Sequence, residues 1–210
     1  MLNVQFSISL RSRLYLDLPM CNGVCKHKRP DGSICGKPLD VKGTHARSCA
    51  VGGWLVRKHN TCLGVLADWA EEEGDCTTFW EQVLPTASPD HSQARMDLVV
   101  FSPRVAGPVF VDLTVVSALS VEALAKNSAT QDGVAARLAA ADKVNKYPQC
   151  RLMPFPLEDH GRLGDAAMNF AKLIAPVDPE RRSVALSRLY HGLAAVLQRT
   201  AADAIITACA

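Results

Sequence analysis

Two short apolar runs near the middle of the chain each contain one aspartate, and this pairing limits what the chain can fold into. Asp97 lies in the run 95–101 and Asp112 in the run 109–116. Both runs are β-branched and aromatic, so they are predicted to be buried strands joined as a hairpin. A buried carboxylate is costly unless it is paired or binds a cation, and a divalent metal would make two neighbouring ones tolerable. Two solvent-facing aspartates at strand ends are the alternative.

Length and charge set the class of protein. The 210 residues suffice for one ordinary domain with a small appendage, and the hydrophobic fraction of 48% argues against wholesale disorder. The net charge of +2 gives no global basic field, but between residues 11 and 58 ten basic residues face three acidic ones. This basic stretch could contact phosphates, and an unevenly charged solvated surface is the alternative.

The eight cysteines are expected to be reduced. No apolar run is long enough to span a bilayer, and residues 1–6 lack the features of a signal peptide. In a reducing compartment, metal binding is more common than a disulfide framework. Cysteines at metal-ligand spacing are therefore expected to bind a metal rather than to pair.

A group of cysteines and histidines has that spacing. Cys25 and Cys35 flank the turn-forming segment 29–32, and His45 and Cys49 are four residues apart, so they can share one helical face. Tetrahedral zinc takes four ligands of these types. The predicted zinc ligands are Cys25, Cys35, His45 and Cys49.

Other cysteines leave alternatives open. Cys21 is a fifth candidate and could replace Cys25 as a ligand. A handful of reduced, partly buried thiols without a metal is the alternative to a zinc site. The later cysteines are isolated and are predicted to be core residues; they are Cys62, Cys76, Cys150 and Cys209.

Basic residues precede a predicted helix. The apolar spacing predicts a helix over about 61–73, with Asn60 or Thr61 as its N-cap. Cations just before a helix N-terminus suit phosphate binding, because the first amide groups point at the same place. The basic residues in question are Arg57, Lys58 and His59.

The rest of the chain alternates strands and helices. The alanine-rich segment 134–147 favours a helix that packs closely on a sheet, with Lys143 and Lys146 near its end beside Tyr147. Favourable charges at a helix C-terminus are the alternative interpretation of these lysines. The expected elements are a strand at 77–83, a loop at 85–93, a helical region at 121–147 broken at 132–133, a strand at 150–155, a helix at 163–174, and a last helix from 181 past 197.

This order of elements fits a restriction-endonuclease-like core, which carries one acid on its second strand and D-x-K or E-x-K on its third. Here Met96 stands where proline is usual, and Thr114 stands where lysine is usual. The full set of motifs resembles the C-terminal restriction-like endonuclease domain of site-specific non-LTR (LINE-type) retrotransposons, in the PD-(D/E)XK superfamily. The resemblance covers about residues 21–175. Its motifs here are Cys25, Cys35, His45 and Cys49, then Lys58-His59-Asn60, then Asp97 and Asp112, then Lys143-Val144-Asn145-Lys146-Tyr147.

The resemblance implies an α/β fold. It would contain a restriction-endonuclease-like core, that is, a small mixed sheet flanked by helices, with an N-terminal zinc knuckle. The expected domains are a zinc-knuckle region at 1–52, a nuclease core at 53–175 and a C-terminal helix at 176–210. The implied origin is a retrotransposon.

The resemblance also implies an activity, which is metal-dependent hydrolysis of DNA phosphodiesters by nicking. Asp97 and Asp112 would bind Mg²⁺ or Mn²⁺, and Lys143 would be the lysine displaced from the strand to the helix. Zn²⁺ would be structural. The expected partner is DNA, and RNA is the alternative. No membrane is expected to take part, and the expected location is the nucleus. The expected substrate-binding residues are Arg57, His59, Lys146 and Tyr147, and Glu81 is an additional candidate metal ligand.

The sequence leaves two rival functions open. One is a nucleic-acid-binding module that contains zinc but has lost cleavage, which Met96 and Thr114 favour. The other is a zinc-stabilised interaction domain in which the two aspartates are surface residues. The distances among the side chains of Asp97, Asp112 and Lys143 distinguish these possibilities.

Overall fold

The computed structural model describes residues 3–84, 94–148 and 150–210, so the expected loop at 85–93 lies outside the described residues. The chain forms two compact units, which are described separately. The cysteine unit comprises the chain up to Cys62 together with Ala195–Ala210, and the sheet unit comprises Leu63–Ala194. None of the helices in the described parts combines the length and apolar character that a bilayer crossing needs.

Two long helices contribute to both units. Helix α3 (Trp54–Gly74) begins in the cysteine unit and ends in the sheet unit, and helix α7 (Pro179–Cys209) does the reverse. The units therefore divide the chain differently from the expected boundaries at residues 52 and 175. Of the C-terminal helix, one half belongs to each of the two units.

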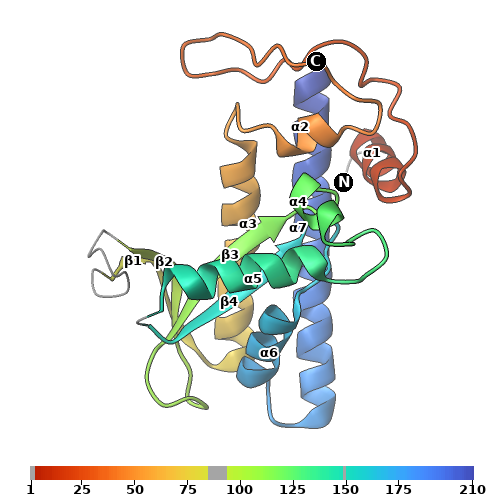
Figure 1. Cartoon of the computed structure of the whole chain (residues 1–210). Helices are drawn as coiled ribbons and strands as arrows, with labels where there is room; N and C mark the ends of the chain where they lie inside the picture. The colour runs from red at the N-terminus through yellow and green to blue at the C-terminus, as the bar shows by residue number, and fades with distance from the viewer. Residues whose placement is uncertain (1–2, 85–93, 149) are drawn as a thin grey trace. The chain divides into compact units, whose positions relative to one another are not determined.

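The sheet unit is a mixed α/β structure with a four-stranded mixed sheet in the order β1-β2-β3-β4 (Figure 1). The first three strands form an antiparallel meander, and the last pairs parallel to β3. The hairpin predicted for the two aspartate runs is confirmed. The parallel pairing needs a crossover, which two helices provide. The elements are β1 (Thr77–Val83), β2 (Arg95–Phe101), β3 (Val109–Val116), α4 (Val121–Ala125), α5 (Val134–Lys146) and β4 (Leu152–Glu158).

Helices flank this sheet on both faces. Helix α5 packs on β3 and β4 (Figure 1). On the opposite face of β4, Phe155 meets Phe170 of helix α6 (Asp165–Ile174) edge to face, with ring centroids 5.9 Å apart. Trp80 of β1 lies beside Gly64 of α3. Side chains on a strand alternate between its two faces, which is how one short strand serves both layers.

Helix α3 begins seven residues earlier than the expected residue 61. Gly52 and Gly53 both have positive φ, at 86° and 73°, and Arg57 N–H donates to the Gly53 carbonyl at 2.9 Å. Thr61 does not cap the helix: its hydroxyl donates to the Arg57 carbonyl at 2.7 Å inside it. The prediction that residues 57–59 precede the N-terminus is therefore wrong, and they lie in the first two turns. The glycine pair, rather than the asparagine and threonine, marks the start.

The cysteine unit contains two further helices around the end of α7. Helix α1 (Asn3–Arg13) was not expected from the sequence, because its apolar residues have little helical periodicity. It is held by tertiary contacts instead: Ile8 is buried in a cluster with Ile205, and the Ser9 hydroxyl donates to the Gln198 carbonyl at 3.2 Å. Helix α2 (Thr44–Ser48) is a short helix of 5 residues.

Candidate metal centre and acidic site

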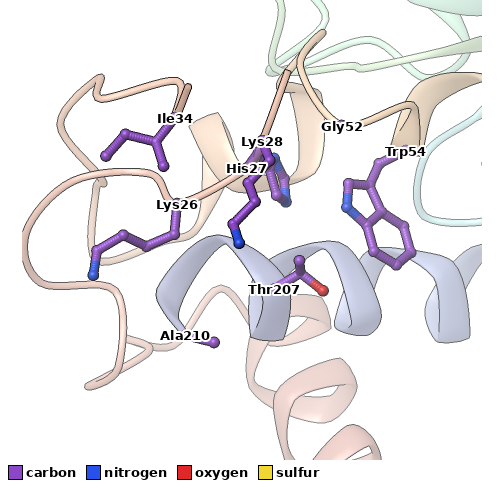
Figure 2. Close-up of a pocket in the computed structure, with 8 residues that line it drawn as sticks. All are labelled: Lys26, His27, Lys28, Ile34, Gly52, Trp54, Thr207 and Ala210. Carbon is purple, nitrogen blue, oxygen red and sulfur yellow. The ribbon is translucent and has the colours of Figure 1, made fainter. Parts of the chain in front are cut away.

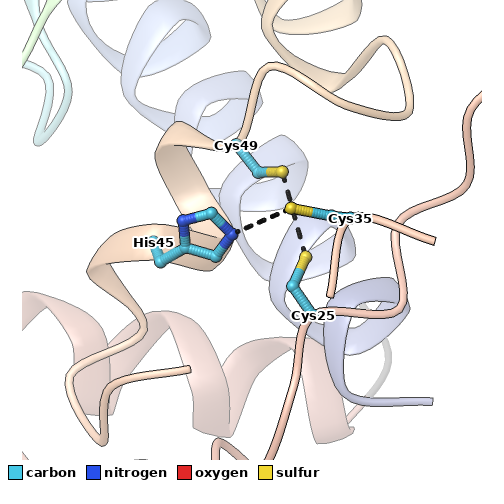
Figure 3. A group of neighbouring side chains, drawn as sticks. All are labelled: Cys25, Cys35, His45 and Cys49. Carbon is cyan, nitrogen blue, oxygen red and sulfur yellow. Dashed lines mark hydrogen bonds between the residues drawn. The ribbon is translucent and has the colours of Figure 1, made fainter. Parts of the chain in front are cut away.

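Four ligand-type side chains converge in the cysteine unit. Their ligand atoms all lie within 4.8 Å of one another (Figure 3). Figure 3 shows the three sulfur atoms and the imidazole directed at a common point. The predicted residues are thus brought together, and the cluster could hold a zinc ion. It consists of Cys25, Cys35, His45 and Cys49.

The first two cysteines lie on opposite arms of a small hairpin. Cys25 N–H donates to the Lys37 carbonyl at 2.8 Å, and Cys35 N–H donates to the His27 carbonyl at 2.8 Å. The tip is closed by Asp31, whose carboxylate accepts the Ser33 N–H at 2.9 Å. The turn chemistry of the sequence therefore sets the approach of the two sulfur atoms.

Helix α2 supplies the other half of the cluster. His45 lies within it, and Cys49 follows its last residue as the C-cap. Asp40 orients this segment: its carboxylate accepts the N–H groups of Thr44 at 2.9 Å and His45 at 2.8 Å. Burial works to raise the pKa of Asp40, but these backbone donors hold it below its ordinary value. This supporting residue was not expected from the sequence, although an aspartate a few residues before a helix is a recognisable capping signal.

Two separations within the cluster match those of a tetrahedral zinc site. Zn–S bonds of about 2.3 Å and Zn–N bonds of about 2.0–2.1 Å require S···S edges of about 3.8 Å and S···N edges of about 3.6 Å. Cys25 Sγ and Cys49 Sγ are 3.9 Å apart, and Cys35 Sγ and His45 Nε2 are 3.5 Å apart. Three sulfur atoms with one nitrogen are also the donors that zinc prefers. The residues present therefore fit zinc.

The surroundings shift the pKa values of two thiols of the cluster in opposite directions. Burial and, to a smaller extent, the neighbouring sulfur of Cys49 raise the pKa of the Cys25 thiol to about 12, against a hydrogen bond from the His27 backbone that lowers it. At Cys35 the Lys37 backbone N–H is the largest influence, and it lowers the thiol pKa. Three thiolates, the form that binds a metal, would be costly in this partly buried place unless they shared a cation.

Cys21 does not belong to the cluster. Its sulfur lies 3.3 Å from the sulfur of Cys209 in α7, and burial followed by the Cys209 thiol raises the pKa of Cys21 to about 12. Cys25 itself is among the four converging residues. The structure therefore selects Cys25 over Cys21.

The Lys58-His59-Asn60 motif divides into a buried and an exposed part. Lys58 is 7% exposed, and its ammonium donates to the Arg47 carbonyl at the end of α2, at 3.3 Å. Its place is structural, since it holds the segment that carries His45. His59 instead pairs with Asn60, with Nδ1 and Oδ1 3.1 Å apart. The Arg57 guanidinium lies over the Trp54 indole, 4.5 Å from its centroid.

In the sheet unit the two aspartates lie on adjacent strands. Leu98 pairs with Val111, so the same antiparallel register sets Asp97 opposite Asp112. The Asp97 carboxylate accepts the Leu113 N–H at 2.7 Å, which fixes it against β3. The two carboxylates also interact electrostatically: the negative charge of Asp97 helps to raise the pKa of Asp112.

Lys143 reaches this pair from helix α5. Its ammonium lies 2.6 Å from Oδ1 of Asp112, whose residue is only 3% exposed. Burial raises the pKa of the Asp112 carboxyl, and the Lys143 ammonium opposes that rise without cancelling it. The alternative that both aspartates face solvent is therefore wrong for Asp112.

The last two residues of the lysine motif, Lys146 and Tyr147, contact each other. The Lys146 ammonium lies 5.0 Å from the Tyr147 ring centroid, and contact with Tyr147 raises the lysine pKa, with smaller contributions from Asp112 and Asp97. Tyr147 is 4% exposed and packs with Met96 in a small apolar cluster. Its ring is therefore a core element beside the acidic pair.

The remaining candidate acid has another partner. Glu81 stands opposite Asp97 in the β1–β2 register, but its carboxylate pairs with Arg95 at 3.1 Å on an exposed surface. Its φ of 49° is a left-handed conformation that non-glycine residues rarely adopt within a strand. The structure thus places Glu81 in the same row as the two aspartates, turned toward Arg95.

The two residues that differ from the pattern that the sequence resembles, Met96 and Thr114, lie on β2 and β3. Met96 is fully buried, and the Thr114 hydroxyl is buried with no hydrogen-bond partner among the described residues. Thr114 is two positions beyond Asp112 and shares its face of β3. No family model matches this chain, and no curated protein matches its sequence.

Proposed function

We propose that the chain is a metal-dependent DNA endonuclease that nicks DNA, with a restriction-endonuclease-like core of retrotransposon origin and a structural zinc site. The observation that carries the proposal is the contact between Lys143 and Asp112, opposite Asp97 on the neighbouring strand. Two carboxylates, from β2 and β3, thereby lie near one ammonium from α5. The resemblance of the sequence motifs supports the same interpretation.

The acidic pair has the donor chemistry for Mg²⁺ or Mn²⁺. Mg²⁺ is commonly held by one or two carboxylates together with substrate phosphates and water. Asp97 and Asp112 would hold the ion. A cation bound there would lower the pKa of a water and stabilise charge on the phosphate that is attacked. Lys143 would orient that water or neutralise the scissile phosphate, because its ammonium already lies at the carboxylate.

The cysteine cluster would hold Zn²⁺ and thereby order the hairpin and α2. Exposed basic residues of the cysteine unit, including Arg57 and the partly exposed His59, would contact the DNA backbone. Lys146 would add a phosphate contact next to the acidic pair. We propose DNA rather than RNA as the substrate, acted on in the nucleus.

A binding module without cleavage is the second candidate, and Thr114 favours it. The strand position where lysine is usual carries a hydroxyl with no partner among the described residues. The ion pair would then be purely structural, neutralising a buried carboxylate. Nicking of supercoiled plasmid in the presence of Mn²⁺ separates the two: open-circular product supports the nuclease, and intact plasmid with retained DNA binding supports the module.

The choice of lysine is testable on one helix. Lys143→Ala is expected to lower the nicking rate about 10²-fold or more, the scale of losing one electrostatic stabiliser. Lys146→Ala is the matched variant and should lose less, because its ammonium lies over Tyr147. Time courses of plasmid nicking at saturating Mg²⁺ give both rates. A slow Lys146→Ala beside a Lys143→Ala of parental rate would show that the wrong lysine was chosen.

Backbone recognition predicts a steep dependence on salt. Replacing Arg57 and His59 together by glutamine is expected to weaken duplex binding on unrelated sequences alike, and to reduce the slope of log K against log salt by about 1. Arg181→Gln, an exposed arginine of the sheet unit, is the control. Fluorescence anisotropy across a salt series measures the slopes. An affinity that does not change with salt would contradict the phosphate-contact model.

A further inference from the structure

The cysteine unit contains a pocket of about 680 Å³ that the proposed nuclease chemistry does not use (Figure 2). Its volume lies in the range of small-molecule sites, about 300–1,000 Å³. Figure 2 shows two lysines on one side, the Trp54 indole on the other, and Thr207 of α7 between them. The lining residues on which the argument depends are Lys26, His27, Lys28, Trp54 and Thr207.

The lysines give the pocket a positive edge. Lys26 and Lys28 are both exposed, and neither takes part in an ion pair within residues 3–84, 94–148 and 150–210. They are held two positions apart on the arm of the hairpin between Cys25 and Arg29. This edge of the pocket therefore carries the positive charge that an anion such as a phosphate requires.

The aromatic side is already positioned. Trp54 is half-buried as the first residue of α3, and the Arg57 guanidinium lies over its ring at 4.5 Å. Its indole is a wall of the pocket. An aromatic wall with an adjacent positive edge is the combination that single-stranded nucleic-acid sites use, with a base on the ring and the backbone along the cations.

A buried polar atom adds a second feature. His27 is fully buried, and its Nε2 lies 2.9 Å from the Ala204 carbonyl oxygen. Because a carbonyl only accepts, Nε2 carries the hydrogen and Nδ1 of the neutral ring is an acceptor. Nδ1 has no partner among the described residues. A buried acceptor without a donor is costly, and this one belongs to a residue that lines the pocket.

We propose that this pocket binds one nucleotide of a DNA single strand, with its base against Trp54 and its phosphate at Lys26 and Lys28. The inference rests on the proposal that the chain acts on DNA. It adds a single-strand site in the cysteine unit, formed by residues other than the zinc ligands. A nick with a frayed end, or a locally opened duplex, would supply such a nucleotide.

The test measures binding without cleavage. The full chain carrying Asp112→Asn is titrated with fluorescein-labelled oligo-dT and, separately, with a labelled duplex, with zinc retained and no other divalent cation added. Trp54→Ala is expected to weaken oligo-dT binding about tenfold or more, and Trp54→Phe to restore most of it. Lys26→Ala with Lys28→Ala should also weaken it. Lys126→Ala with Lys172→Ala removes the same charge from exposed sites of the sheet unit and is the matched control.

The outcomes distinguish a single-strand site from a general basic surface and from a free-nucleotide site. Parental oligo-dT affinity in Trp54→Ala would overturn the proposal. An equal loss for duplex and single strand would also overturn it, because it would indicate a general basic surface. Unlabelled thymidine monophosphate that competes as well as the oligonucleotide would make a free nucleotide the ligand and contradict the single-strand assignment. Zinc content equal to that of the parent shows that the variants keep the fold of the cysteine unit.

This experiment and the nicking assay fail independently. Oligo-dT binding that depends on Trp54, in a chain that never nicks plasmid, would support the single-strand site and contradict the endonuclease proposal. Nicking that depends on Asp112, in a chain whose single-strand binding ignores Trp54, would do the opposite.

Discussion

Asp112→Asn is expected to reduce plasmid nicking to the level of a protein-free control, while DNA binding stays equal or becomes slightly tighter. The amide keeps the size of the carboxylate but removes the charge that would hold a divalent cation. Binding is spared because a negative charge that faces phosphate is lost. The measurements are nicking of supercoiled plasmid with Mg²⁺ or Mn²⁺ and anisotropy with a labelled duplex.

The control for this variant is Asp142→Asn, which removes an exposed carboxylate from the same helix as Lys143. It should nick at the parental rate. Thermal unfolding of both variants shows whether the loss of the ion pair has disturbed the sheet unit. If Asp112→Asn nicks as fast as the parent, the nuclease proposal itself fails.

Removal of zinc is expected to have the largest effect on folding. The purified chain should hold one zinc per molecule, and a strong chelator should unfold the hairpin and α2, because ligand binding supplies folding free energy in small zinc modules. Cys35→Ser should lose the metal, since its sulfur is one of the four converging ligand atoms. Elemental analysis gives the stoichiometry, and hydrogen exchange locates the unfolding.

Cys21→Ser is the matched variant for this experiment, because Cys21 lies in the same unit but contacts Cys209 instead of the cluster. It should keep one zinc per chain. Protein purified without chelators that contains no zinc would contradict the metal site. Loss of zinc in Cys21→Ser, with retention in Cys25→Ser, would show that Cys21 rather than Cys25 is the zinc ligand.

The sheet could be predicted from the sequence because its strands have strong local signals. The β-branched runs around Asp97 and Asp112 gave the correct ranges and the correct antiparallel pairing. The fourth strand was placed two residues early at its start and three residues short at its end, since Pro154 and Pro156 lie within it and proline weakens a strand signal. The four residues of the cysteine-histidine cluster were found for a related reason, which is that their chemistry and spacing are unusual.

Features that depend on tertiary contact could not be predicted in this way. Helix α1 follows its packing against α7, and the start of α3 follows two glycines of positive φ rather than the asparagine and threonine that resembled a cap. The burial of Lys58, the role of Asp40 and the Cys21–Cys209 contact join segments whose meeting no local pattern indicates. The pocket at Trp54 belongs to the same group.

The ion pair between Lys143 and Asp112 has a consequence for how the proposed nuclease would acquire its metal. The ammonium already offsets one of the two carboxylate charges, so the protein alone attracts a cation less than two bare carboxylates would. In the proposed nuclease, the phosphates of bound DNA would supply the negative charge that the ammonium offsets. Metal and DNA should therefore each raise the affinity for the other by the same factor, as linkage requires. Such an enzyme would remain largely metal-free between substrates, and it would be complete only on DNA.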